Sequence, residues 1–187
     1  NIPLNEIEDM DSILIIGSTI RKETPIIAHW IKKAADRNCE INIINHSLDE
    51  YHFPIENYLL SETSLIAENT GLIVKAALSL INKEFPDHIL EHLSKLKEPS
   101  PAHIKTAKSL IGKKSFVISG LVARNNKYYS LIRSYIDILS SMTDSSSGEI
   151  TFSANTAGAY ISGCIPHRSS FGRTKEIGLN ALQISNN

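Results

Sequence analysis

The sequence has little cysteine, no long apolar run and almost no net charge, and each shortage excludes a class of protein. Its 187 residues include only Cys39 and Cys164, whereas an iron–sulfur cluster takes four cysteine ligands. No apolar stretch approaches the roughly 20 residues of a membrane-spanning helix. A formal net charge of -1 provides no electrostatic footprint for nucleic acid. We therefore expect no nucleic-acid partner, no direct membrane insertion and no redox centre in this chain.

The composition that remains is that of a globular α/β protein. With 42% hydrophobic and 21% charged residues, the chain is long enough to bury one sizeable core. We expect one α/β domain over residues 1–187, with a candidate sub-boundary near 98–101. There Pro99-Ser100-Pro101 interrupts helix formation, because proline lacks a backbone donor and restrains the residue before it.

The clearest local pattern is a strand, a turn and a helix near the start of the chain. The run Ile13–Ile16 is typical of a strand buried on both faces, and Gly17 permits a tight turn after it. Thr24 and Pro25 then resemble a helix cap and a first helical residue. A second strand is predicted over 40–45, which completes a right-handed crossover unit.

The rest of the chain continues to alternate between helical and strand patterns. Ser61 is the predicted cap of the next helix, and Trp30 on the first helix is a predicted core residue. Since buried strands separated by amphipathic helices demand crossovers, we predict an α/β fold: a three-layer Rossmann-like domain with a mainly parallel sheet and helices on both faces. The remaining predicted helices lie over about 65–81, 85–97 and 131–142, with a short helix that ends at 111 and another after 155–158. The remaining predicted strands lie over 115–120 and 150–153, and residues 145–148 are predicted to form a surface loop.

The best ligand candidate is the loop after the first strand, formed by Gly17, Ser18, Thr19 and Arg21. In open α/β sheets, ligands lie at the carboxyl ends of the strands. Backbone donors at the following helix start can hold an anion, and Arg21 can add a charge-assisted contact. The alternative is that Gly17 only serves the turn and Arg21 pairs with a carboxylate in this or a neighbouring domain.

Three other patterns imitate functional sites. Gly112-Lys113-Lys114-Ser115 resembles the end of a phosphate-binding loop, but the first glycine of that motif is missing and a strand follows, so we reject it. His88 and His92 offer two zinc ligands on one helix face, but no third ligand is nearby, which favours a solvated helix face. Cys164 and His167 resemble a nucleophile and its base. Without oxyanion partners, a packed thiol beside a turn is the better interpretation.

Three segments resemble the molybdopterin-oxidoreductase superfamily. The first runs from Ile7 to Asn45 and begins Ile-Glu-Asp-Met-Asp-Ser-Ile-Leu-Ile-Ile-Gly-Ser-Thr-Ile-Arg-Lys-Glu-Thr-Pro. The others are Ala154–Ala159 (Ala-Asn-Thr-Ala-Gly-Ala) and Gly163–Arg168 (Gly-Cys-Ile-Pro-His-Arg). Within the superfamily, the chain is most similar to the large peripheral-arm subunits of bacterial NADH-quinone oxidoreductase, which is respiratory complex I, over roughly residues 4–182.

The resemblance implies a parent much longer than this chain. It implies 2Fe-2S and 4Fe-4S clusters in an N-terminal part of that parent, and a complex that transfers electrons from NADH through FMN and iron–sulfur clusters to quinone with proton translocation. The implied partners are the other peripheral-arm subunits and the rest of the same subunit, at the cytoplasmic side of the bacterial inner membrane. The chain on its own is then an excised, inactive domain.

Two departures from the superfamily pattern bear on the cofactor. Members that hold a molybdopterin guanine dinucleotide commonly have Asn-Pro after the Gly-Thr pair and Asp-Pro-Arg after the second strand, whereas this chain has Thr19-Ile20 and Asn45-His46-Ser47. We therefore interpret Gly17, Ser18, Thr19 and Arg21 as a relic nucleotide loop, and expect no catalytic residue, metal or cofactor in this chain. The alternative is the guanine-dinucleotide-binding domain of an active molybdenum or tungsten oxidoreductase such as a formate dehydrogenase.

Overall fold

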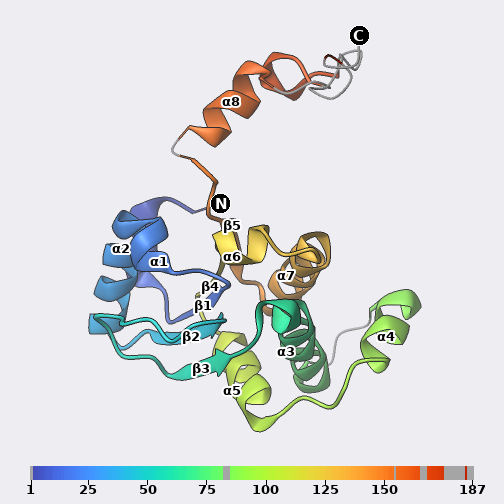
Figure 1. The fold of residues 1–187 in the computed structure, drawn as a ribbon. Helices are drawn as coiled ribbons and strands as arrows, with labels where there is room; N and C mark the ends of the chain where they lie inside the picture. The colour runs from blue at the N-terminus through green and yellow to red at the C-terminus, as the bar shows by residue number, and fades with distance from the viewer. Residues whose placement is uncertain (1, 82–84, 154, 165–167, 175–183, 185–187) are drawn as a thin grey trace. The chain divides into compact units, whose positions relative to one another are not determined.

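The structure, a computed structural model, describes residues 2–81, 85–153, 155–164, 168–174 and 184. The chain forms two compact units, Asn1–Ile150 and Thr151–Asn187. The first unit contains the sheet and most of the helices (Figure 1). Pro99-Ser100-Pro101 lies inside this unit, where it separates two helices.

Five parallel strands form the sheet of the first unit, in the order β3-β2-β1-β4-β5. This arrangement confirms the predicted α/β class with a parallel sheet. The strands are β1 (Ser12–Ile16), β2 (Glu40–Asn45), β3 (Asn57–Leu60), β4 (Ser115–Ser119) and β5 (Ser146–Glu149).

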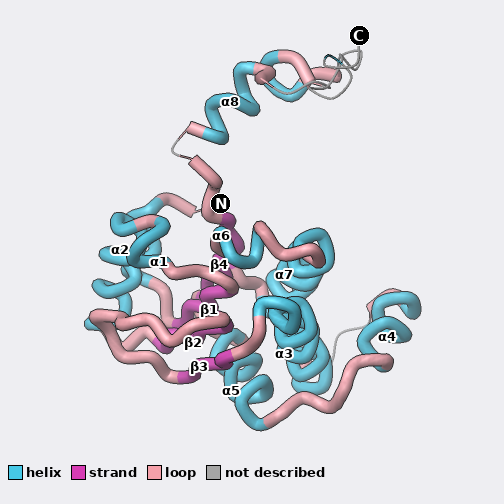
Figure 2. Tube along the Cα trace, in the orientation of Figure 1, coloured by secondary structure: helices cyan, strands magenta, loops and turns pink. Residues whose placement is uncertain are grey.

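Helices cover both faces of the sheet, as Figure 2 shows by colour. Helix α2 and a 3-10 helix lie on one face, and α3, α5 and α7 lie on the other. No helix of the described residues is long and apolar enough to cross a membrane. The helices of this unit are α1 (Ile20–Glu23), α2 (Pro25–Asp36), α3 (Ile66–Leu80), α4 (Asp87–Ser94), α5 (Pro101–Leu110), α6 (Leu121–Arg124) and α7 (Tyr129–Thr143), with 3-10 helices η1 (Leu4–Asp9) and η2 (Thr63–Leu65).

Strand β1 supplies both hydrophobic cores because its side chains alternate between the two faces of the sheet. Leu14 and Ile16 belong to the core under α3 and α7, whereas Ile13 and Ile15 belong to the core under α2. All four are fully buried, and each such side chain stabilises the fold by about 1.5–3 kcal/mol. The apolar run read from the sequence is therefore the central strand of the domain.

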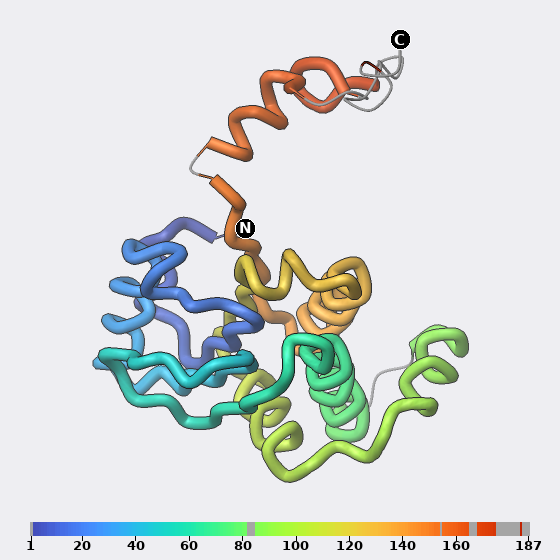
Figure 3. Tube along the Cα trace, in the orientation of Figure 1, coloured from blue at the N-terminus to red at the C-terminus, as the bar shows by residue number. Residues whose placement is uncertain are grey.

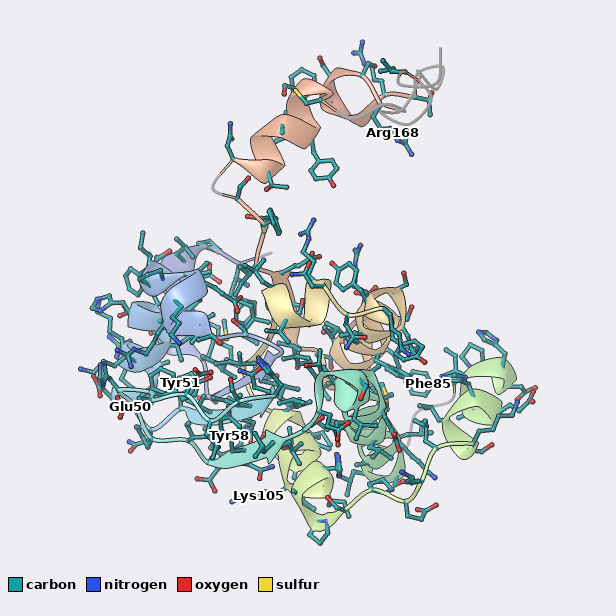
Figure 4. The ribbon with its side chains drawn as sticks, in the orientation of Figure 1. Glu50, Tyr51, Tyr58, Phe85, Lys105 and Arg168 are labelled. Atoms are coloured by element: carbon teal, nitrogen blue, oxygen red, sulfur yellow. The ribbon has the colours of Figure 1, made fainter. Side chains whose placement is uncertain are left out.

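The second unit is small and is described by itself. It contains α8 (Thr156–Ser162), which ends at Gly163 with a left-handed φ of 82°, and the 3-10 helix η3 (Ser170–Gly172). Arg168, labelled in Figure 4, forms an antiparallel bridge with Thr174. The predicted short helix is present. Of the second and third resemblance segments, residues 154 and 165–167 lie outside the described residues.

The last strand and the surface loop before it were predicted at the wrong residues. The last strand is Ser146–Glu149, which was predicted as a surface loop, and residues 150–153 form no strand. Small polar residues form this edge strand because their backbone pairs with β4, and a Cβ added at Gly148 would lie 3.0 Å from the Phe116 ring. Three short elements, α1, β3 and α6, were not predicted from the sequence.

Two residue predictions also need correction. Ser61 does not cap α3, because η2 intervenes, and its hydroxyl accepts a hydrogen bond from Asn69 at 2.9 Å instead. Trp30 is half-buried rather than a core residue, since Lys33 lies 4.2 Å over its ring at the surface.

Candidate functional site

The candidate site lies where the strand order reverses, at the carboxyl ends of β1 and β4. Strand β1 is followed by α1 and α2, which pack on one face of the sheet, and β4 is followed by α6 and α7 near the other. In doubly wound sheets, this switch point is where the crevice for a ligand opens. Figure 3 shows the two loops involved, one in the blue part of the chain and one in the yellow part.

Gly17 begins the loop after β1 and is required by its geometry. Its φ of 56° is left-handed, and an added Cβ would lie 2.6 Å from the backbone nitrogen of Ala123. Its carbonyl accepts the N–H of Ala123 at 3.1 Å, and its own N–H donates to the carbonyl of Ile44 at 2.8 Å. Gly17 therefore joins the loop after β1 to strand β2 on one side and to α6, which follows β4, on the other, as its predicted turn role requires.

Three donors at this corner point to one carboxylate, that of Glu23. One oxygen accepts the backbone N–H of Thr19 at 2.7 Å, and the other accepts the hydroxyl of Ser18 at 3.0 Å and the backbone N–H of Leu121 at 2.9 Å. Thr19 lies at the start of α1, and Leu121 lies at the start of α6. The two helix starts at the switch point thus share one internal anion.

Gly120 leaves the space that Glu23 occupies. An added Cβ there would lie 2.2 Å from the Cβ of Ser18 and 2.7 Å from Oε2 of Glu23. Ser18 is itself fully buried. The corner is consequently packed around the carboxylate, with no room for a larger side chain at position 120.

A second internal carboxylate, that of Asp49, lies in the loop after β2. It accepts hydrogen bonds from the hydroxyls of Thr19 at 3.2 Å and Ser47 at 3.1 Å and from the side-chain amide of Asn45 at 3.4 Å. Lys22 lies 3.8 Å from it. This loop contains the segment that stands in place of the superfamily's Asp-Pro-Arg, and its polar groups bind one another.

Two tyrosines complete this edge of the sheet and are labelled in Figure 4. The hydroxyl of Tyr51 donates to the carbonyl of Ser18 at 3.4 Å, and that of Tyr58 donates to the carbonyl of Ser47. Burial raises the pKa of both phenols, so both remain protonated donors at neutral pH. Asn45 also donates to the Ser18 carbonyl, at 3.1 Å.

Arg21 lies beside the corner, where it lines a cavity of about 340 Å³ with Thr19, Lys22 and Asp49. Its guanidinium donates to the backbone carbonyl of Glu50, a carbonyl rather than the carboxylate that the alternative interpretation expected. The side chain lines a surface cavity of about 290 Å³ together with His29, Lys32 and Phe53. Of the four residues in the predicted loop, Ser18 and Thr19 therefore bind the Glu23 carboxylate, whereas Arg21 lines the adjoining cavity and binds a backbone carbonyl.

The residues at the corner do not fit the phosphate of a dinucleotide. A phosphate here needs free N–H donors, and the donors of Thr19 and Leu121 are already bound to Glu23. It would also lie beside the negative charges of Glu23 and Asp49, which repel an anion. Sequence reasoning missed both carboxylates, because the short helix α1 that contains Glu23 was not predicted and Asp49 lies in a loop.

The other sequence candidates show no functional site of their own among the described residues. Gly112 follows α5 and Lys113 pairs with Glu40 at 2.8 Å, so this segment leads into β4 rather than cradling a phosphate. His92 contacts the hydroxyl of Tyr135 at 2.8 Å, and among the described residues no three His, Cys, Asp or Glu side chains form a metal-binding group. Cys164 is exposed rather than packed, and His167 lies outside the described residues.

Comparison with known proteins supports the superfamily resemblance at a distant level. The chain is 33% identical over 99 residues to the F420-dependent formate dehydrogenase subunit alpha of Methanocaldococcus jannaschii, a match that spans 50% of this chain. It covers only 15% of that much longer protein. The chain matches no family model.

A solved structure shares the fold. Over 91% of this chain and 46% of its own chain, the X-ray crystal structure of the formyltransferase/hydrolase complex from Methylorubrum extorquens with methylofuran matches with a TM-score of 0.53. At 13% identity, this is a likeness of fold alone. The sequence match therefore shows distant similarity to the molybdopterin-oxidoreductase superfamily through a formate dehydrogenase alpha subunit, and the structural match adds only the shared fold.

Proposed function

We propose that this chain is a molybdopterin-oxidoreductase-like scaffold domain of a larger oxidoreductase and that it holds no dinucleotide itself. The observation that carries this proposal is the Glu23 carboxylate, which accepts the hydrogen bonds of Ser18, Thr19 and Leu121 at the switch point. A domain that binds its own side chain there contributes packing surfaces to its parent rather than cofactor contacts.

The type of parent is a separate part of the proposal. Similarity to a formate dehydrogenase alpha subunit favours a formate-dehydrogenase-like parent, and this is the assignment that the comparisons support better. In its active form, such a parent would hold a molybdenum or tungsten guanine dinucleotide, with this domain as one wall of the cofactor site. That second candidate requires Glu23 to leave the corner.

The loss of the dinucleotide fits the NADH-quinone oxidoreductase assignment instead. The segments Asn155–Ala159 and Gly163–Arg168 resemble the large peripheral-arm subunit, and Thr19-Ile20 replaces the cofactor-contacting pair. In that assembly the domain would pack against cluster-bearing regions and neighbouring subunits at the cytoplasmic side of the bacterial inner membrane. Electrons would pass through FMN and iron–sulfur clusters outside this domain.

Metal and pterin analysis of the full-length parent separates these candidates. A scaffold domain in an NADH-quinone oxidoreductase predicts iron without molybdenum, tungsten or pterin, together with NADH-dependent quinone reduction. Stoichiometric pterin with molybdenum or tungsten, together with formate oxidation, would overturn the scaffold proposal and establish the second candidate.

A further inference from the structure

We infer that Glu23 acts as a built-in ligand of the nucleotide corner, and that its carboxylate holds the loop after β1 to the loop after β4 in the place of a bound anion. A free carboxylate of the right size should replace it when the side chain is removed. This inference deepens the proposed function and rests on its claim that the domain holds no dinucleotide.

The contacts of Glu23 go beyond those of a local helix cap. Its bond to the N–H of Thr19 spans four residues and belongs to the start of α1. Its bond to the N–H of Leu121 spans 98 residues and crosses the switch point to α6. A helix cap bonds only to N–H groups at the start of its own helix. Because the Glu23 carboxylate also bonds to the start of a second helix, it links the two halves of the sheet.

The charges around the corner support an internal counter-ion. The nearby cations have other partners: Lys22 lies by Asp49, and Arg124 binds Glu149 at 2.8 Å. The backbone donors that contact the Glu23 carboxylate are the N–H groups of Thr19 and Leu121. One carboxylate satisfies both, and a second anion has no unpaired donor among these groups.

Removing the side chain should create a site for acetate. In Glu23→Ala, the missing heavy atoms are those of an acetate ion, and the donors of Ser18, Thr19 and Leu121 remain in place. Buried donors without a partner are unfavourable, which gives the free carboxylate a reason to bind. A ligand that binds only the folded state raises the unfolding temperature saturably.

The test is thermal unfolding of the 187-residue chain in sodium acetate, with sodium chloride at equal ionic strength as the reference. Glu23→Ala should unfold at a lower temperature than the native chain, and acetate should restore part of the difference saturably. Acetate should leave the native chain and Glu91→Ala unchanged, because Glu91 is an exposed helix residue whose carboxylate pairs with Lys95. An acetate response no larger in Glu23→Ala than in Glu91→Ala would overturn the inference.

Amide hydrogen exchange keeps the inference testable if Glu23→Ala does not fold. In the conservative variant Glu23→Gln, the N–H groups of Thr19 and Leu121 should both exchange roughly tenfold faster than in the native chain, which corresponds to about 1.4 kcal/mol. Faster exchange at Thr19 with an unchanged rate at Leu121 would show a local cap only and would overturn the link. A parent that contains pterin while acetate rescue succeeds would refute the scaffold function and leave the Glu23 link standing.

Discussion

Glu23 accepts the backbone N–H of Leu121 at 2.9 Å, and this bond connects the loops on the two sides of the strand-order reversal. The bond forms because Gly17 and Gly120 let the two loops approach more closely than any side chain at those positions would allow. A corner that is typically open to ligands in this class of fold is thus closed by the chain itself.

The close approach at Gly17 predicts a large loss of stability in Gly17→Ala. The methyl group would combine a left-handed φ of 56° with a 2.6 Å contact to backbone, so we expect a loss of about 3 kcal/mol in the free energy of unfolding. Gly112→Ala is the matched control, because its φ is 68° but no atom lies within 4 Å of an added Cβ. It should lose only about 1–2 kcal/mol in urea unfolding. Equal losses in the two variants would show that the loop contact is unimportant.

The buried ring of His103 predicts a pH-dependent stability. Burial lowers its pKa below the ordinary value of 6.5, while Nδ1 faces the N–H of Ser100 at 3.1 Å and Nε2 faces Oδ1 of Asn69 at 2.8 Å. The folded state therefore favours the neutral ring, and the unfolded state binds more protons as the pH falls. The contribution is fully present above pH 6.5 and is lost as the pH falls below that value toward the folded pKa.

Urea unfolding between about pH 7.5 and 5.5 measures this effect. The native chain should lose more stability over this range than His103→Gln, which has no group to titrate there. His52→Gln, a change at an exposed histidine, should behave as the native chain does. Identical pH dependence in His103→Gln and the native chain would refute the prediction.

The two cysteines should differ in reactivity. Burial raises the pKa of Cys39 to about 12, and the residue is only 6% exposed, so its reactive thiolate is scarce. Cys164 is exposed. A thiol reagent such as DTNB should react quickly with one thiol in the folded chain, with both in denaturant, and with none in folded Cys164→Ser. One fast thiol in Cys164→Ser would contradict the buried position of Cys39.

The fold was predictable where burial imposes an apolar pattern, and not where backbone pairing alone decides. Ile13–Ile16 predicted a central strand because both faces of β1 are buried. The edge strand Ser146–Glu149 has no apolar side chain, and its structure comes from hydrogen bonds to β4. Edge strands need no hydrophobic pattern, so the sequence favoured a loop at this position.

The candidate site was predictable in place but not in chemistry. The loop from Gly17 to Arg21 does follow the carboxyl end of β1, as a strand followed by glycine and a helix predicts, whereas the strand order that makes this end the switch point has no local pattern. The role of Glu23 depends on Leu121, which is 98 residues away in the chain. No local pattern reports such a contact, because it exists only after the two strands have paired.

Calorimetric titration of GDP into the 187-residue chain tests the central claim most directly. Specific binding needs free donors for the phosphates, and those at the corner are bound to Glu23. We predict no saturable heat at GDP concentrations up to about millimolar, which corresponds to a binding free energy weaker than about -4 kcal/mol. Micromolar affinity, about -8 kcal/mol, that is abolished by Arg21→Ala would contradict the claim and restore the dinucleotide-binding interpretation.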